Sequence, residues 1–103
     1  MHKQTKATAI TPKVKREVME RDGGLCIVCG APGDPVSHVV RRSQGGLGVA
    51  RNVVTHCWRC HQMYDLRTSE AVRQSTMDYI KRMYPGWTAE SVKYSKYGDT
   101  WIK

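Results

Sequence analysis

The sequence contains no phenylalanine, few acidic residues and no long apolar run. A transmembrane helix needs about 18 or more consecutive apolar residues, so the composition excludes a membrane span. No apolar stretch follows the polar start MHKQTK, so we expect no secretory signal and a cytoplasmic protein. The missing Phe argues against a large apolar core. A single domain of 103 residues with a small apolar core usually needs a further source of stability, such as disulfides or a structural metal.

The shortage of acidic residues leaves a strongly basic chain. There are 17 Lys and Arg against 9 Asp and Glu, which gives a formal net charge of +8. The basic residues are spread along the chain and do not form a tail. Such a balance in a small domain is typical of proteins that bind a polyanion, above all nucleic acid.

The four cysteines form two C-x2-C pairs, Cys26 with Cys29 and Cys57 with Cys60. Two intervening residues let both thiolates of a pair face one ion, and two pairs complete a tetrahedral set. Disulfides or free thiols are the alternative, but a reducing compartment disfavours disulfides. The pattern therefore predicts a structural Zn²⁺ that contributes about 10 kcal/mol or more of folding free energy.

Capping and turn residues predict the order of the elements. Thr11 and Pro12 form a helix start, and Gly23 with Gly24 forms a stop. We expect a flexible basic arm over residues 1–10 and a C-terminal tail over residues 98–103. Between them we expect a helix over 12–21, strands over 36–42 and 51–55, helices over 58–66 and 69–84, and a short helix from Thr88.

The stretch that the cysteines bracket resembles the HNH endonuclease family. The matching residues are the two C-x2-C pairs, the run SHVVRRSQGG over 37–46, and Asn52 with His61 at fitting intervals. The resemblance implies an α+β fold with a small ββα-metal, treble-clef-like core over 26–67. An N-terminal helix and a helical extension over 69–97 would complete one nuclease domain over 11–97.

The same resemblance implies metal-dependent hydrolysis of DNA phosphodiester bonds, by nicking or double-strand cleavage with low sequence specificity. His38 matches the family's general base, because a neutral imidazole can take a proton from water at pH 7. Alternatively, His38 is a strand histidine that a backbone carbonyl satisfies. Asn52 matches the Asn that holds the hairpin loop through backbone hydrogen bonds, with a left-handed turn Asn as the alternative.

His61 matches the family's metal-binding histidine, and Asp65 lies four residues later on the same helical face. The two are expected to chelate a catalytic divalent ion, Mg²⁺, Mn²⁺, Ni²⁺ or Zn²⁺, unless Asp65 is only a solvated helix charge near Arg67. Ser37 departs from the family, which usually has Asp, Glu or His before the base, so Ser37 is at most a weak or water-mediated ligand. A second departure is Arg41, where the family often has Pro. His56 also departs, since an apolar residue usually precedes the second cysteine pair, and it is expected to be structural or a surface phosphate contact.

Other side chains near the motif are candidates for contact with DNA. Guanidinium groups match phosphate geometry, and the expected phosphate contacts are Arg41, Arg42, Arg51 and Arg59. Trp58, between the second pair of cysteines, is expected to pack over the zinc site, with base stacking as the alternative.

Two other functions fit the same sequence. One is a zinc-stapled DNA-binding module without nuclease activity, which the departure at Ser37 supports. The other is an accessory partner of phage terminase subunits, because the chain is similar to small stand-alone HNH proteins encoded beside phage terminases. We expect a monomer or weak dimer in the cytoplasm of a bacterial or phage-infected cell.

Overall fold

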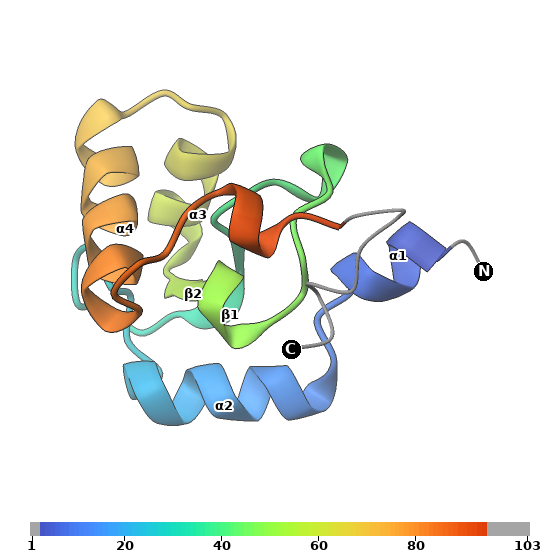
Figure 1. Cartoon of the computed structure of the whole chain (residues 1–103). Coiled ribbons are helices and arrows are strands. Elements are labelled where there is room, and N and C mark those ends of the chain that lie inside the picture. The colour runs from blue at the N-terminus through green and yellow to red at the C-terminus, as the bar shows by residue number, and fades with distance from the viewer. Residues whose placement is uncertain (1–2, 95–103) are drawn as a thin grey trace.

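The structure is a computed structural model that describes residues 3–94 (Figure 1). The predicted tail over 98–103 and the end of the predicted helical extension lie outside the described residues. The elements run in the order α1 (Lys3–Thr8), α2 (Pro12–Asp22), β1 (Asp34–His38), η1 (Arg42–Gln44), η2 (Ala50–Asn52), β2 (Val53–His56), α3 (Trp58–Asp65), α4 (Glu70–Met83) and η3 (Glu90–Val92). Over this part of the chain, no helix is long and apolar enough to cross a bilayer.

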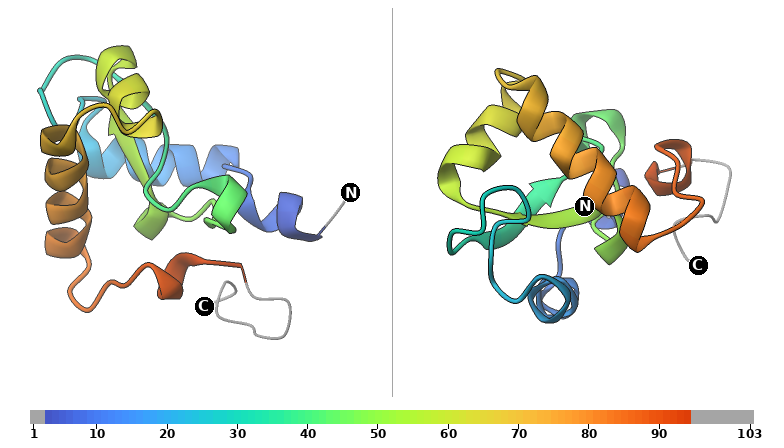
Figure 2. Two further views of the ribbon diagram at one scale, coloured as in Figure 1. Left: turned by 90° about the horizontal axis from the view of Figure 1, so that it is seen from above. Right: turned by 90° about the vertical axis from the view of Figure 1, so that its left-hand side faces the viewer.

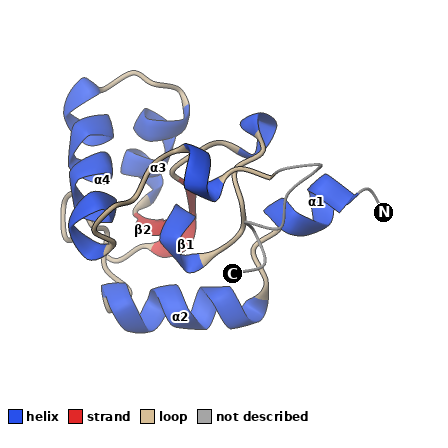
Figure 3. Cartoon of the chain, in the orientation of Figure 1, coloured by secondary structure: helices blue, strands red, loops and turns tan. Residues whose placement is uncertain are grey.

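The centre of the fold is a ββα unit made of β1, β2 and α3. The two strands are antiparallel, with Ser37 opposite Val54 and His38 opposite Val53. Helix α2 covers one side of this hairpin, while α3 and α4 lie on the other (Figure 2, Figure 3). The predicted α+β class and ββα-metal core are confirmed.

Local capping explains where the helices begin and end. The Thr11 hydroxyl accepts a hydrogen bond from the Val14 N–H at 3.2 Å, and Pro12 occupies the first helical position of α2. Gly23 ends α2 in the left-handed region, with φ of 68°. Ser69 caps α4 in the same way through the Val72 N–H. The predicted short helix after Thr88 is a 3₁₀ turn instead of an α-helix.

Residues 3–8 form helix α1, where we had expected a flexible arm. The Gly48 N–H donates to the Ala7 carbonyl at 3.0 Å, and Thr8 is buried. A Cβ added at Gly48 would lie only 2.0 Å from the Ala9 carbonyl oxygen, so only glycine allows the two backbones to approach this closely. The N-terminal segment is therefore packed against the loop between the strands.

The apolar core is small and divided. One cluster lies beneath α4 and η3 and consists of Val39, Val40, Val54, Ile80, Trp87 and Val92. A second surrounds the cysteines and consists of Cys26, Cys60, Tyr64 and Val72. This division agrees with the expectation that the chain has too little apolar area for one large core.

A buried ion pair joins α2 to the rest of the domain. Arg21 binds Asp22 and also donates to the carbonyls of Ala50 and Val53, both at 2.7 Å. Asp22 further accepts from the Thr55 N–H and the Tyr79 hydroxyl, so α2, β2 and α4 meet at one carboxylate. Burial alone would raise the pKa of Asp22, but the hydrogen bonds from Arg21 and Tyr79 outweigh it and hold that pKa below its usual range.

We predict that Asp22→Asn lowers the free energy of unfolding by about 3 kcal/mol or more, because it leaves the Arg21 charge buried without its partner. Urea denaturation at a fixed zinc concentration measures this loss. Asp78→Asn is the matched control on the exposed face of α4, and it should change stability by less than about 0.5 kcal/mol. Equal effects of the two substitutions would contradict the structural role of the Asp22 pair.

Candidate active site and metal cluster

The four cysteines lie together as free thiols, with all Sγ atoms within 4.8 Å of one another. The Sγ atoms of Cys29 and Cys57 are 3.5 Å apart. A tetrahedral zinc with Zn–S bonds of about 2.3 Å places its sulfurs about 3.8 Å apart, so the cluster has the size of such a site. The cysteines can therefore hold a structural metal ion such as zinc.

Backbone geometry and electrostatics also prepare the cluster for a cation. Gly30, with φ of 79°, closes the first turn by donating its N–H to the Cys26 carbonyl at 2.9 Å. Burial opposes ionisation of Cys26, but backbone N–H groups from Cys29 and Cys57 outweigh it and lower the pKa of Cys26 to about 7. Burial and the sulfur of Cys57 raise the pKa of Cys60. Neighbouring thiolates repel each other, and a bound cation would relieve this repulsion.

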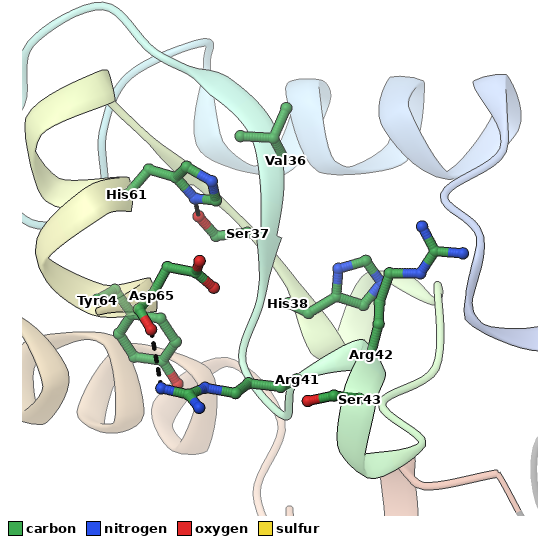
Figure 4. Close-up of a pocket in the computed structure, with 9 residues that line it drawn as sticks. All are labelled: Val36, Ser37, His38, Arg41, Arg42, Ser43, His61, Tyr64 and Asp65. Atoms are coloured by element: carbon green, nitrogen blue, oxygen red, sulfur yellow. Dashed lines mark hydrogen bonds between the residues drawn. The ribbon is translucent and has the colours of Figure 1, made fainter. Parts of the chain in front are cut away.

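A cavity of about 380 Å³ opens between β1, the turn that follows it, and α3 (Figure 4). Both sides of the HNH-like motif reach it: β1 supplies the candidate base and α3 supplies the candidate metal ligands. The cavity is lined by Val36, Ser37, His38, Arg41, Arg42, Ser43, His61, Tyr64 and Asp65.

His38 has one ring nitrogen engaged and the other available. Its Nε2 lies 2.7 Å from the Thr8 carbonyl oxygen. A carbonyl only accepts, so Nε2 carries the proton and Nδ1 carries the lone pair. Burial lowers the pKa of His38, and the nearby Arg42 lowers it further, against the Thr8 hydrogen bond that raises it. The ring is thus neutral at pH 7, and the carbonyl partner that we considered as an alternative to catalysis leaves Nδ1 free.

Asn52 is fully buried and clasps the loop between the strands. Its Oδ1 accepts from the Val40 N–H at 2.8 Å, and its Nδ2 donates to the carbonyls of Val40 at 3.1 Å and Leu47 at 2.9 Å. The left-handed alternative is wrong, because Arg67 alone among the described non-glycine residues has a positive φ. The clasp also explains why β1 ends at His38 and not at residue 42: the amide takes the hydrogen bonds of Val40 that a longer ladder would use.

His61 and Asp65 lie one helical turn apart on α3, and both side chains face the cavity (Figure 4). The Asp65 carboxylate forms no ion pair with any residue between 3 and 94, so the structure does not pair it with Arg67. Its backbone carbonyl accepts from Arg41 Nη2 at 2.8 Å, which ties the turn after β1 to α3. An imidazole nitrogen and a carboxylate oxygen are therefore available side by side for a divalent ion.

Ser37 does not stand alone beside His61. Its Oγ lies 2.6 Å from His61 Nδ1 and 2.7 Å from Nδ1 of the buried His56. Burial and the neighbouring His61 lower the pKa of His56 to about 4, so this ring is neutral. His56 Nε2 lies 3.0 Å from the Thr76 hydroxyl. Sequence reasoning missed Thr76, although a polar residue between Val72 and Ile80 on the buried face of α4 was a usable signal.

Only two of the four arginines that we expected to contact DNA line the cavity. Arg41 and Arg42 line the cavity, whereas Arg51 and Arg59 do not. Arg42 Nε donates to the Thr8 hydroxyl at 3.3 Å, so the N-terminal segment contacts both Arg42 and His38. Arg59 is exposed at the start of α3.

The prediction that Trp58 packs over the cysteine cluster is wrong. The side chain is 71% exposed, and its ring centroid lies 6.1 Å from that of His61. The indole of Trp58 is thus exposed to solvent next to a residue of the cavity. The alternative for Trp58, stacking on a base, stays a prediction.

Comparison with known proteins agrees with the geometry. Residues 26–65 match the family model described as HNH endonuclease. That match begins at the first cysteine of the cluster and ends at Asp65. No curated protein and no solved structure gave a match to the chain. The ββα unit lies within this match, so residues 26–65 are similar to the HNH endonuclease family.

Proposed function

We propose that this protein is a metal-dependent DNA endonuclease with little sequence specificity. The observation that carries the proposal is one cavity that combines an imidazole with a free lone pair, an imidazole–carboxylate pair and two arginines. Phosphodiester hydrolysis needs these three elements: a base for water, a site for a divalent ion and cations for the phosphate. A module that only binds DNA would have no use for the free Nδ1 of His38.

Two metal ions fit the residues present. The four cysteines would hold a structural zinc, whose thiolate ligands suit a reducing, cytoplasmic compartment. His61 and Asp65 would hold the catalytic ion, with Mg²⁺, Mn²⁺, Ni²⁺ and Zn²⁺ all compatible with nitrogen and oxygen donors. When bound, this ion supplies Lewis-acid stabilisation of the charge on the phosphate and on the departing 3′ oxygen.

His38 is the general base of the proposed reaction. Its Nδ1 takes a proton from the attacking water, while the Thr8 carbonyl keeps the Nε2 proton in place and stabilises the imidazolium that forms. In-line attack on phosphorus then breaks its bond to the 3′ oxygen, which takes a proton from solvent water, and leaves a 5′ phosphate and a 3′ hydroxyl. Arg41 and Arg42 border the same cavity and would bind the phosphates on either side of the scissile bond.

DNA would extend beyond the cavity along the start of α3. Arg59 is exposed there, next to the open indole of Trp58. A base can stack on an exposed aromatic ring whatever its identity, which agrees with low sequence specificity.

We predict that His38→Ala lowers the rate of plasmid nicking by about 100-fold or more, because the water loses its base. The assay compares wild type and variant with Mg²⁺, Mn²⁺, Ni²⁺ and Zn²⁺ in turn. Zinc content and the circular dichroism spectrum should be unchanged. Undiminished nicking by the variant would remove His38 from the mechanism. A wild type that binds DNA but nicks with none of these ions would identify a DNA-binding module.

We also predict that deletion of residues 1–9 lowers nicking by up to about 100-fold, since His38 Nε2 loses the Thr8 carbonyl and the ring is no longer oriented. The cysteine cluster lies in other segments, so bound zinc should remain at the wild-type level. Thr8→Ala is the control for the carbonyl, because it keeps the carbonyl on His38 and removes only the hydroxyl with its hydrogen bond to Arg42. A deletion variant as active as wild type would show that the N-terminal segment does not orient the base.

A further inference from the structure

A continuous chain of hydrogen bonds leads from the cavity to the buried face of α4. It starts at His61 Nδ1, passes through the Ser37 hydroxyl at 2.6 Å and reaches His56 Nδ1 at 2.7 Å. It continues from His56 Nε2 to the Thr76 hydroxyl at 3.0 Å and ends at the Val72 carbonyl, 2.8 Å further on. Ser37, His56 and Thr76 are at most 1% exposed, so water does not compete for these groups.

The end of the chain fixes the direction of every proton in it. The Thr76 hydroxyl donates its single proton to the Val72 carbonyl, so its oxygen must accept from His56 Nε2–H. His56 is 1% exposed and both of its hydrogen-bond partners are hydroxyls, so no carboxylate stabilises a second ring proton. Its lone pair is then at Nδ1, which accepts the Ser37 hydroxyl proton. The Ser37 oxygen has no proton left for His61 and accepts from His61 Nδ1–H. In the neutral form of His61 the lone pair is then at Nε2.

We propose that Ser37, His56 and Thr76 are positioning residues that hold His61 as its Nδ1–H tautomer and so present Nε2 to the catalytic ion. The role of the ion rests on the proposed function, whereas the tautomer follows from the hydrogen bonds and from the burial of His56. Ser37 is then not a metal ligand. Its hydroxyl proton is engaged by His56 and its oxygen by His61, which leaves it poorly suited to bind an ion.

This arrangement gives one explanation for two departures from the family pattern. Ser37 stands where an acidic residue or His is usual, and His56 stands where an apolar residue is usual, and the two are in direct contact. A metal-bound histidine generally donates its other N–H to an oxygen acceptor that sets the orientation of its ring. Here a serine oxygen is that acceptor, and the buried His56 fixes which way the serine points.

The tautomer can be read directly by NMR in zinc-loaded protein without a catalytic ion. Long-range ¹H–¹⁵N spectra at neutral pH distinguish a protonated ring nitrogen from one with a lone pair, and His61→Ala identifies the His61 signals. We expect Nδ1–H for His61 and Nε2–H for His56 in the wild type. An Nε2–H tautomer at His61 would overturn the proposal, whether or not the protein cleaves DNA.

Thr76→Val tests the chain at its far end, remote from the cavity. Without the hydroxyl, His56 loses its fixed acceptor, and the His61 signals should shift to a mixture of tautomers. Thr55→Val is the matched control: Thr55 is equally buried, but its hydroxyl has no hydrogen-bond partner among the described residues. In Thr55→Val, His56 and His61 should keep their wild-type tautomers. If Thr76→Val does not fold, Ser37→Ala breaks the same chain two steps closer to His61.

Calorimetric titration with Mn²⁺ gives a second readout. Thr76→Val and Ser37→Ala should weaken Mn²⁺ binding by about 10- to 100-fold, whereas Thr55→Val should not. Loss of affinity in Ser37→Ala with none in Thr76→Val would make Ser37 a ligand and overturn its positioning role. Asp65→Ala tests the proposed metal site separately: wild-type affinity in that variant would refute the site, while the tautomer of His61 would still stand on the NMR result.

Discussion

The close approach of four cysteine sulfurs, which a cation would hold together, is the constraint on which the rest of this domain depends. The sulfurs lie within 4.8 Å of one another, and two of them are buried. They tie the turn before β1 to the start of α3, and His61 follows the last of them directly in the chain. Metal binding at this point would therefore stabilise the fold and also set the position of α3 relative to β1.

The two histidines of the cavity are held in the same way, by a hydrogen bond at one ring nitrogen, but their partners differ. Each has one ring nitrogen held by an oxygen acceptor, and each therefore offers the other nitrogen as a lone pair. His38 is held by a backbone carbonyl from the N-terminal segment, which frees Nδ1. His61 is held by the Ser37 hydroxyl, which frees Nε2 in the proposed arrangement. In the proposed mechanism, one type of side chain thus supplies both the proton acceptor, His38, and the metal ligand, His61.

Features that depend on neighbouring residues could be predicted from the sequence. Thr11 and Gly23 fix the ends of α2 through hydrogen bonds, and Pro12 fits its first position because it has no N–H. The cysteine spacing predicts the cluster because two residues between ligands limit the turn geometry. The shared face of His61 and Asp65 follows from helical periodicity alone. These predictions succeed because the physical cause lies within a few residues of its effect.

Features that depend on distant contacts could not be predicted in this way. The N-terminal helix is held by the backbone at Gly48, and the Thr8 carbonyl reaches His38 across thirty positions of sequence. Strand β1 ends early because the amide of Asn52 takes the hydrogen bonds of Val40. Thr76 joins the site only because α4 packs against β2. Side-chain and backbone partners of this kind leave no local periodicity.

We have proposed that the cavity holds a catalytic ion on α3 while the cysteines hold a separate structural ion. Anomalous scattering from crystals of the protein soaked with Mn²⁺ tests this most directly, with data collected at the zinc and manganese edges. We expect a zinc peak among the four cysteine sulfurs and a manganese peak bonded to His61 Nε2 and Asp65, away from the Ser37 hydroxyl. Manganese bound elsewhere, or bound through Ser37 Oγ, would contradict it.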